Sequence, residues 1–223
     1  MCGRYTLTVS GRVLAELFDL EEVPEVVARY NIAPTQQVPI VRVDLDGTRR
    51  FSAARWGLIP SWAKEINIGA RMVNARAETA ADKPAFRGAV KRRRCLLPAD
   101  GFYEWQAQGA GKQPYLIRFA DGRPFAFAGL HEVWRPPDGP PLTSCTIVTT
   151  SPNELVARLH DRMPVILPRA LFAEWLEPRE LPRERLAELL RPCPPDGMEA
   201  FPVSRQVNNP KNDASACAER IVV

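Results

Sequence analysis

Short runs of alternating hydrophobic and polar residues fill most of the chain, and this period of two predicts strands rather than long helices. Residues 38–60 alternate on both sides of Asp46 and Gly47, which predicts two strands joined by a turn. Residues 113–134 repeat the pattern around Asp121 and Gly122 and predict a hairpin. Further short strands are expected at residues 94–106 (interrupted by Pro98 and Gly101), 142–150, 163–168 and 199–204.

Helical patterns are few and short. Residues 10–18 place apolar side chains on one face directly behind Ser10, which predicts a helix with Ser10 as its N-cap. Two more amphipathic helices are expected at residues 170–177 and 182–191. The 22 prolines of this 223-residue chain also argue against long helices.

One further helix is expected at residues 151–160. Ser151 suits the N-cap, Pro152 the first helical position, and Glu154 completes a capping box. Because strands still dominate, we expect an α+β protein, a single domain with an antiparallel, barrel-like β core and short peripheral helices.

Composition narrows the class of protein. No apolar run reaches the length of a membrane span, and the first residues do not resemble a secretory signal, so we expect a cytoplasmic protein. The five cysteines form no CxxC pair and there are only two histidines, which argues against a disulfide framework or a metal site. No cofactor is expected.

Charge is unevenly distributed along the chain. The net charge is only +4, but residues 83–94 contain six basic residues and no acidic ones. Such a segment suits a phosphate backbone. It is equally compatible with a solvated face on which Lys and Arg stems cover apolar surface, and charge alone favours that simpler interpretation.

The N-terminus carries the most distinctive candidate chemistry. If Met1 is removed, Cys2 presents an α-amine and a thiol on adjacent carbons, both partly nucleophilic near neutral pH. Such a 1,2-aminothiol condenses with an aldehyde, first to a Schiff base and then to a five-membered thiazolidine ring. A cysteine at position 2 can also be an accident of a frayed terminus.

Three internal stretches offer partners for this chemistry. Asn74, Arg76 and Glu78 alternate along an expected strand and so share one face, as a ligand site or as an exposed sheet face. Glu104 lies between two aromatic residues, where partial burial would raise its pKa toward acid–base work unless it points to solvent. His160 ends an expected helix, as a proton shuttle or a favourable helix C-terminal charge.

Taken together, these stretches resemble the SRAP family of abasic-site processing proteins. The segments occur in the family's order, from MCGRY through WGLIPSWAK, NARAET, RRCLLPADGFYEW and HDRMPVIL to PVSRQVNNPKN. The resemblance runs from Cys2 to about Asn212 and predicts an SRAP domain over residues 2–213, followed by a C-terminal tail over residues 214–223.

The resemblance implies a function and a set of catalytic residues. Family members bind single-stranded DNA and capture the aldehyde of abasic sites as a thiazolidine crosslink that shields the lesion. The family's catalytic positions fall on Cys2, Asn74, Glu104 and His160. The family is also credited with autoproteolytic removal of the leading methionine and with lyase-like and crosslink-reversing activity. The expected partner is single-stranded DNA that contains abasic sites, and no membrane association is expected. We expect the protein to act as a monomer in the cytoplasm, associated with the nucleoid if the host is bacterial.

DNA contacts are expected from the following positions: Arg4, Arg76, Arg87 and Arg162 on phosphates, and Trp62 on an unpaired base. Two departures from the family pattern affect the expected contacts with the bases. Trp62 stands alone where some relatives carry two adjacent tryptophans, and residues 84–86 leave open which side chain wedges against the bases.

Two other functions stay open on the residues alone. Cys2 with a general base could make an N-terminal-nucleophile hydrolase or cysteine peptidase that acts on proteins. The basic segment could instead belong to a non-catalytic single-strand-binding module.

Overall fold

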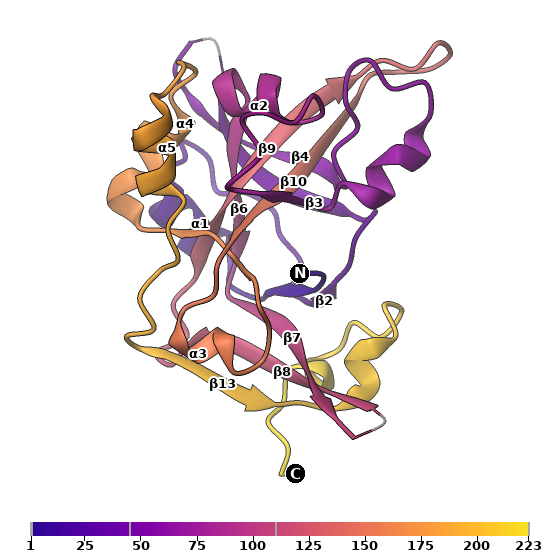
Figure 1. Cartoon of the computed structure of the whole chain (residues 1–223), viewed down its shortest axis with the longest axis vertical. Coiled ribbons are helices and arrows are strands. Elements are labelled where there is room, and N and C mark those ends of the chain that lie inside the picture. The colour runs from indigo at the N-terminus through magenta and orange to yellow at the C-terminus, as the bar shows by residue number, and fades with distance from the viewer. Residues whose placement is uncertain (1, 45, 110, 223) are drawn as a thin grey trace.

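Five strands close into a β-barrel in the computed structural model, which describes residues 2–44, 46–109 and 111–222 (Figure 1). Around the barrel each strand pairs with the next, in the order β10, β4, β3, β6 and β9, and β9 pairs back onto β10. Their bounds are β3 Gln37–Val43, β4 Arg49–Trp56, β6 Arg94–Ala99, β9 Phe125–Trp134 and β10 Leu142–Thr150. The predicted α+β class with a barrel-like core is confirmed.

The barrel is antiparallel except beside β10. There β4 runs parallel to β10, and so does the short strand β5 (Asn74–Arg76), with Asn74 opposite Ile147. Aromatic rings pack against one another in the interior. Tyr5 makes edge contacts with Trp56 and Phe127 at ring-centroid distances of 5.3 and 5.7 Å. These rings fix the barrel against the strand that follows Cys2.

A second sheet of five strands lies against one end of the barrel, in the order β13, β8, β7, β1 and β2 (Figure 1). Its strands are β1 Tyr5–Leu7, β2 Arg29–Ile32, β7 Gly101–Gln108, β8 Gly111–Phe119 and β13 Met198–Pro202. Only Asp100 separates β6 of the barrel from β7 of this sheet. The chain therefore passes from one sheet to the other at the point where the Cys2 strand pairs.

The predicted hairpin over residues 113–134 is wrong in its pairing. The turn is present, with Gly122 at φ 71°, and both strands form. However, β8 pairs with β7 and β13, whereas β9 pairs with β6, β10 and β12. The strands enter different sheets because each has a more extensive partner elsewhere.

The predicted turn at Asp46 and Gly47 joins two paired strands, β3 and β4, as expected. The expected strand at residues 163–168 splits at Val165 into β11 (Met163–Pro164), which pairs with β10, and β12 (Ile166–Leu167), which pairs with β9. This segment thereby bridges two neighbouring barrel strands.

Short helices cover the outside of the sheets (Figure 1). Their bounds are α1 Gly11–Phe18, α2 Arg87–Arg92, α3 Glu154–Ala157, α4 Phe172–Leu176 and α5 Arg183–Leu189, with 3-10 turns η1 Ile66–Arg71, η2 Arg169–Leu171, η3 Arg205–Asn208 and η4 Ser215–Cys217. Ser10 occupies the N-cap position of α1 as predicted, without a side-chain capping bond.

The predicted cap of the helix after β10 is wrong. Asn153 caps α3, since its Oδ1 accepts a hydrogen bond from the Val156 N–H at 3.0 Å. Ser151 lies two residues too early, and the helix ends at Ala157 rather than at His160. Asn153 is buried and its amide also donates to the Cys193 carbonyl at 3.0 Å, so tertiary contacts select it as the cap.

No helix among the described residues is long and apolar enough to cross a membrane. Within those same residues, no three His, Cys, Asp or Glu side chains gather as ligands for a metal ion, and all five cysteines are free thiols.

Candidate functional site

Cys2 lies at the junction of the two sheets and is completely buried. The strand that follows it pairs with β7, and the Tyr103 N–H donates to the Arg4 carbonyl at 3.0 Å, close to Cys2. On the other side, the Asn74 side chain donates from Nδ2 to the Cys2 carbonyl at 2.9 Å. β5 of the barrel therefore fixes the backbone of Cys2.

Asn74 keeps one hydrogen-bonding atom in reserve. Its Oδ1 is buried and accepts no hydrogen bond from the residues that the structure describes. A buried amide oxygen without a donor costs free energy, so this atom is a natural acceptor for a bound amine or hydroxyl group. Asn74 therefore lies beside Cys2, where its bond is to the Cys2 carbonyl.

Glu104 projects from β7, opposite Tyr115 of β8, and only 2% of it is exposed. Burial raises the pKa of this carboxyl to about 7. Burial also raises the pKa of the Cys2 thiol well above its ordinary value, and the nearby Glu104 carboxylate adds to that rise. Cys2 and Glu104 are therefore neighbours, and Glu104 points into the protein rather than to solvent.

His160 follows α3 and is held through its Nδ1. This nitrogen accepts the Arg162 backbone N–H at 3.0 Å and lies 2.8 Å from the Asp161 Oδ1. Burial lowers the pKa of His160. The Asp161 charge contributes to the raised pKa of Glu104, after the effect of burial, so the His160 turn lies near that carboxyl.

The residues predicted to contact DNA fall into two groups. Trp62, Arg76 and Arg87 are exposed, and Trp62 exposes 59% of its surface on the loop between β4 and β5. Arg4 and Arg162 are instead engaged within the protein. Arg162 makes a two-point ion pair with Glu78, at 2.7 and 2.9 Å.

The combination supports proton transfer at a buried sulfur. A thiol with a raised pKa stays protonated near neutrality, and a carboxyl with a pKa near 7 beside it can accept or return that proton. An imidazole and an amide complete the polar surroundings. The predicted loss of Met1 concerns a residue outside the described ranges.

Comparison with known proteins places this arrangement in a family. The family model described as SOS response associated peptidase (SRAP) matches residues 1–210. The chain belongs to the SRAP family. This SRAP chain is 46% identical to the abasic site processing protein YoqW of Bacillus subtilis (strain 168), over 98% of this chain and 99% of that protein. It is 35% identical to the abasic site processing protein HMCES of Gallus gallus, over 84% of this chain and 65% of the relative.

Solved structures share the fold of this chain. A protein from Bacteroides thetaiotaomicron superposes with a TM-score of 0.87 at 26% identity, covering 99% of this chain and all of the other. A protein from Bordetella bronchiseptica reaches a TM-score of 0.79 at 28% identity, covering 91% of this chain and 100% of the other.

Two supports of the SRAP site were not predicted. Asp100 accepts hydrogen bonds from the Thr6 hydroxyl and from the Thr8 N–H and hydroxyl, the last at 2.7 Å, and so holds the Cys2 strand against β7. The only sign of Asp100 in the sequence was the Pro-Ala-Asp-Gly turn. That turn marked a break between two apolar runs but did not indicate that Asp100 would bond to Thr6 and Thr8.

The second support is a loop near the C-terminus. Arg4 donates to the Asn31 Oδ1 at 3.0 Å and to the carbonyls of Val207 and Asn208 at 2.5 and 3.3 Å. Asn31 is fully buried and its amide donates to carbonyls of the same loop, including that of Asn212 at 2.6 Å. The polar run 205–213 therefore packs against the strand that begins with Cys2.

Proposed function

We propose that this SRAP protein captures abasic sites in single-stranded DNA by forming a covalent bond through Cys2 once Met1 has been removed. The observation that carries the proposal is the pairing of a buried N-terminal cysteine with Glu104, whose pKa is raised to about 7. The names of the relatives, which are abasic site processing proteins, support the substrate.

The reaction joins one aminothiol to one aldehyde and releases one water. The α-amine of Cys2 attacks the aldehyde carbon of the ring-opened deoxyribose, and the resulting carbinolamine loses water to give an imine. The thiol sulfur then adds to the same carbon, the carbon–nitrogen double bond becomes single, and the thiol proton passes through a base to that nitrogen. The product is a five-membered thiazolidine, and the second step is fast because both groups already share one residue.

Glu104 is the best placed base for the sulfur. A thiol whose pKa is raised by burial is a poor nucleophile until a neighbour accepts its proton. A carboxyl with a pKa of about 7 is half ionised near neutrality, so it can take the thiol proton and pass it to the nitrogen of the closing ring. The same exchange run backward would reverse the crosslink.

Asn74 and His160 have supporting roles in this proposal. Asn74 already holds the Cys2 carbonyl at 2.9 Å, and its free Oδ1 would accept a hydrogen bond from the α-amine or a sugar hydroxyl. His160 would donate a proton to the sugar ring oxygen or the departing water. Removal of Met1 by the protein itself, with Glu104 as the base, extends the same proton chemistry.

Unpaired DNA suits a buried reactive group. A single strand can bring its sugar to Cys2 without the cost of opening a duplex. Trp62 offers an exposed ring for stacking, and Arg76 and Arg87 offer exposed charges for phosphates. Arg162 is oriented by Glu78, so its contact with a phosphate would use the nitrogen positions that the ion pair leaves open.

The decisive experiment uses an oligonucleotide with one uracil, treated with uracil-DNA glycosylase. We expect wild-type protein to give a heat-stable adduct on a denaturing gel, with a mass equal to protein plus DNA minus one water. The protein should lack Met1 by intact mass. Cys2→Ser and Cys2→Ala both keep the α-amine, so each should still form an imine that borohydride can trap, but neither should form the heat-stable ring without a reductant.

Two results would overturn the proposal. One is an equal yield of adduct from Cys2→Ala. The other is a fully active protein that retains Met1, because the ring needs a free amine. Turnover of a peptide without DNA would instead favour the peptidase, and tight binding to intact strands without an adduct would favour the simple binding module.

A further inference from the structure

Glu78, just beyond β5, holds Arg162 by two parallel hydrogen bonds. The Glu78 Oε1 lies 2.7 Å from the Arg162 Nη1, and the Oε2 lies 2.9 Å from the Nη2. The same Nη2 donates to the Thr149 carbonyl of β10 at 2.6 Å. The Arg162 side chain is 15% exposed and that of Glu78 is 53% exposed, so the two-point geometry and the bond to Thr149, rather than burial of both partners, distinguish this pair from a mobile surface ion pair.

The backbone of Arg162 contacts His160. Its N–H donates to the His160 Nδ1 at 3.0 Å, which requires the lone pair on that nitrogen. The Asp161 Oδ1 approaches the same nitrogen at 2.8 Å, and a carboxylate favours a proton there. Two partners of opposite polarity therefore compete for Nδ1, and the position of the 160–162 backbone decides between them.

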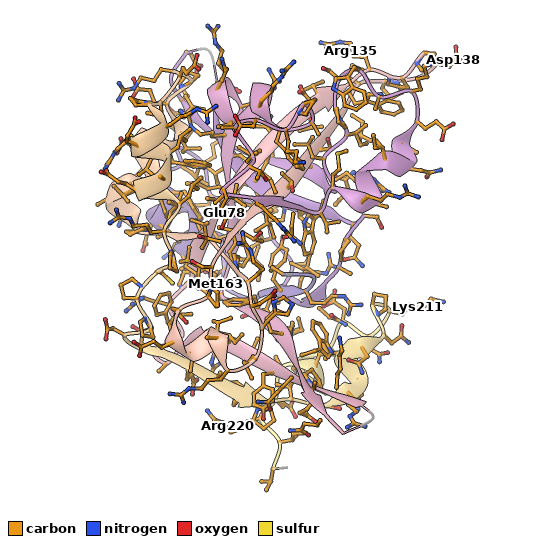
Figure 2. All side chains as sticks on the ribbon, in the orientation of Figure 1. Glu78, Arg135, Asp138, Met163, Lys211 and Arg220 are labelled. Atoms are coloured by element: carbon orange, nitrogen blue, oxygen red, sulfur yellow. The ribbon has the colours of Figure 1, made fainter. Side chains whose placement is uncertain are left out.

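We propose that Glu78 is a positioning residue for His160. By fixing the Arg162 guanidinium on β10, it holds the Arg162 N–H against Nδ1 and keeps the proton of the neutral imidazole on Nε2 (the Glu78 position is labelled in Figure 2). This inference rests on the proposed function, since it makes the Nε2–H of His160 the donor toward the sugar. It also means that the main role of Arg162 is to hold the 160–162 backbone in place, and that contact with a phosphate is a secondary role.

The tautomer is directly measurable because the chain has only two histidines. In protein labelled with ¹⁵N-histidine, long-range ¹H–¹⁵N spectra at neutral to mildly alkaline pH report which ring nitrogen carries the proton. We expect His160 in the wild type to be protonated on Nε2. In Glu78→Gln, the amide cannot accept both guanidinium bonds, so we expect a mixture of the two tautomers, with His131 as an unchanged internal reference.

Two further variants make the test specific. Asp82→Asn removes a carboxylate from the same segment, where Asp82 pairs with Arg183, and should leave the His160 spectrum as in the wild type. Arg162→Lys keeps the charge but loses the two-point geometry, so it should shift the tautomers in the same direction as Glu78→Gln. Melting temperatures of all three variants confirm that they are folded.

The kinetic readout separates positioning from binding. We expect Glu78→Gln to form adduct about tenfold more slowly or worse, because donation from the imidazole is disturbed. Its affinity for intact single-stranded DNA should be unchanged or higher, since a carboxylate is lost beside Arg162. Asp82→Asn should match the wild type in adduct rate.

Several outcomes would overturn the inference. These are an Nδ1-protonated His160 in the wild type, an unchanged tautomer in Glu78→Gln, or a loss of adduct rate that merely parallels a loss of DNA affinity. If the wild type forms no adduct at all, the proposed function fails. The tautomer measurement needs no DNA and still decides whether Glu78 controls His160.

Discussion

The side-chain amide of Asn74 bonds to the backbone carbonyl of Cys2 at 2.9 Å, and this bond joins the two sheets of the protein. Asn74 begins β5, which pairs with barrel strand β10, whereas Cys2 precedes β1 of the other sheet. Cys2 is thus fixed by a strand that lies far from it in sequence.

The Asn74 bond predicts the effect of its nearest isostere. Asn74→Asp replaces the Nδ2 donor by a carboxylate oxygen that faces the Cys2 carbonyl, so the bond becomes a repulsion. We expect adduct formation to slow by about 10- to 100-fold, with little change in affinity for intact single-stranded DNA. Single-turnover gels and fluorescence anisotropy measure the two quantities. Equal losses in both would mean that Asn74 mainly binds DNA.

Glu104 should show a trade-off between activity and stability. Glu104→Gln removes the proposed base, so we expect the adduct rate to fall by about 100-fold or more. In the wild type, that rate should rise with pH through an apparent pKa near 7, the value that burial gives to this carboxyl, because the base acts in its ionised form. Rates measured from about pH 5 to 9 test this, and a rate that is flat across the neutral range would contradict it.

The same carboxyl makes folding depend on pH. Its folded pKa of about 7 lies above the ordinary value of 4.5, so the folded state binds the proton more tightly than the unfolded state. The contribution of this group to the free energy of unfolding is fully present below about pH 4.5 and is lost as the pH rises through 7. Across that window, wild type should lose ~3 kcal/mol relative to Glu104→Gln in urea denaturation. Glu180→Gln, on the exposed surface, is the control and should not change the pH dependence.

Local patterns predicted the strands well, because alternation and turn residues act over a few positions. Gly47 and Gly122 both take the positive φ that their turns require. Pairing was harder to predict. The turn at Gly122 joins β8 and β9 in chain order, yet it is β13 (Met198–Pro202) that pairs with β8. No local sequence pattern indicates a partner so distant in the chain.

The site divides in the same way. The resemblance pointed to Asn74, Glu104 and His160. The structure brings Asn74 and Glu104 to Cys2 and places Asp161, the neighbour of His160, near Glu104. The residues that hold Cys2 in place were missed. In the sequence, Asn31 is one polar residue in a short segment. Its role in anchoring residues 205–213 is evident only from the hydrogen bonds that its amide donates to that loop in the folded protein.

Asp100 predicts a stability effect at the junction of the sheets. Its carboxylate is 8% exposed and accepts bonds from Thr6, Thr8 and Val9. Asp100→Asn turns one acceptor into a donor that faces other donors, so we expect a loss of about 2–3 kcal/mol in the free energy of unfolding. Asp138→Asn, on an exposed loop (labelled in Figure 2), should change it by less than about 0.5 kcal/mol. Comparable losses in both variants would contradict a special role for Asp100.

Arg4 tests whether a predicted phosphate ligand is a structural residue. Because its guanidinium already donates to Asn31 and to the Val207 carbonyl, we expect Arg4→Ala to lower the free energy of unfolding by about 1–3 kcal/mol. The salt dependence of binding to single-stranded DNA should stay as in the wild type. Arg76→Ala is the matched comparison, since Arg76 is exposed, and should reduce that slope by about 0.7 without loss of stability. A reduced slope in Arg4→Ala would restore its role on phosphate.

Trp62 should affect binding without affecting the fold. Its ring is 59% exposed, while the loop beneath it is anchored by the Trp134 Nε1–H on the Ala63 carbonyl at 2.7 Å, so the loop keeps its place without the Trp62 ring. Stacking on one base is worth about 1–3 kcal/mol, and we expect Trp62→Ala to weaken binding to single-stranded DNA by roughly 5- to 150-fold. Trp62→Phe should retain part of the affinity, and the melting temperature of both variants should match the wild type. Anisotropy titrations at fixed salt measure the change, and an alanine variant that binds as tightly as wild type would remove Trp62 from the DNA path.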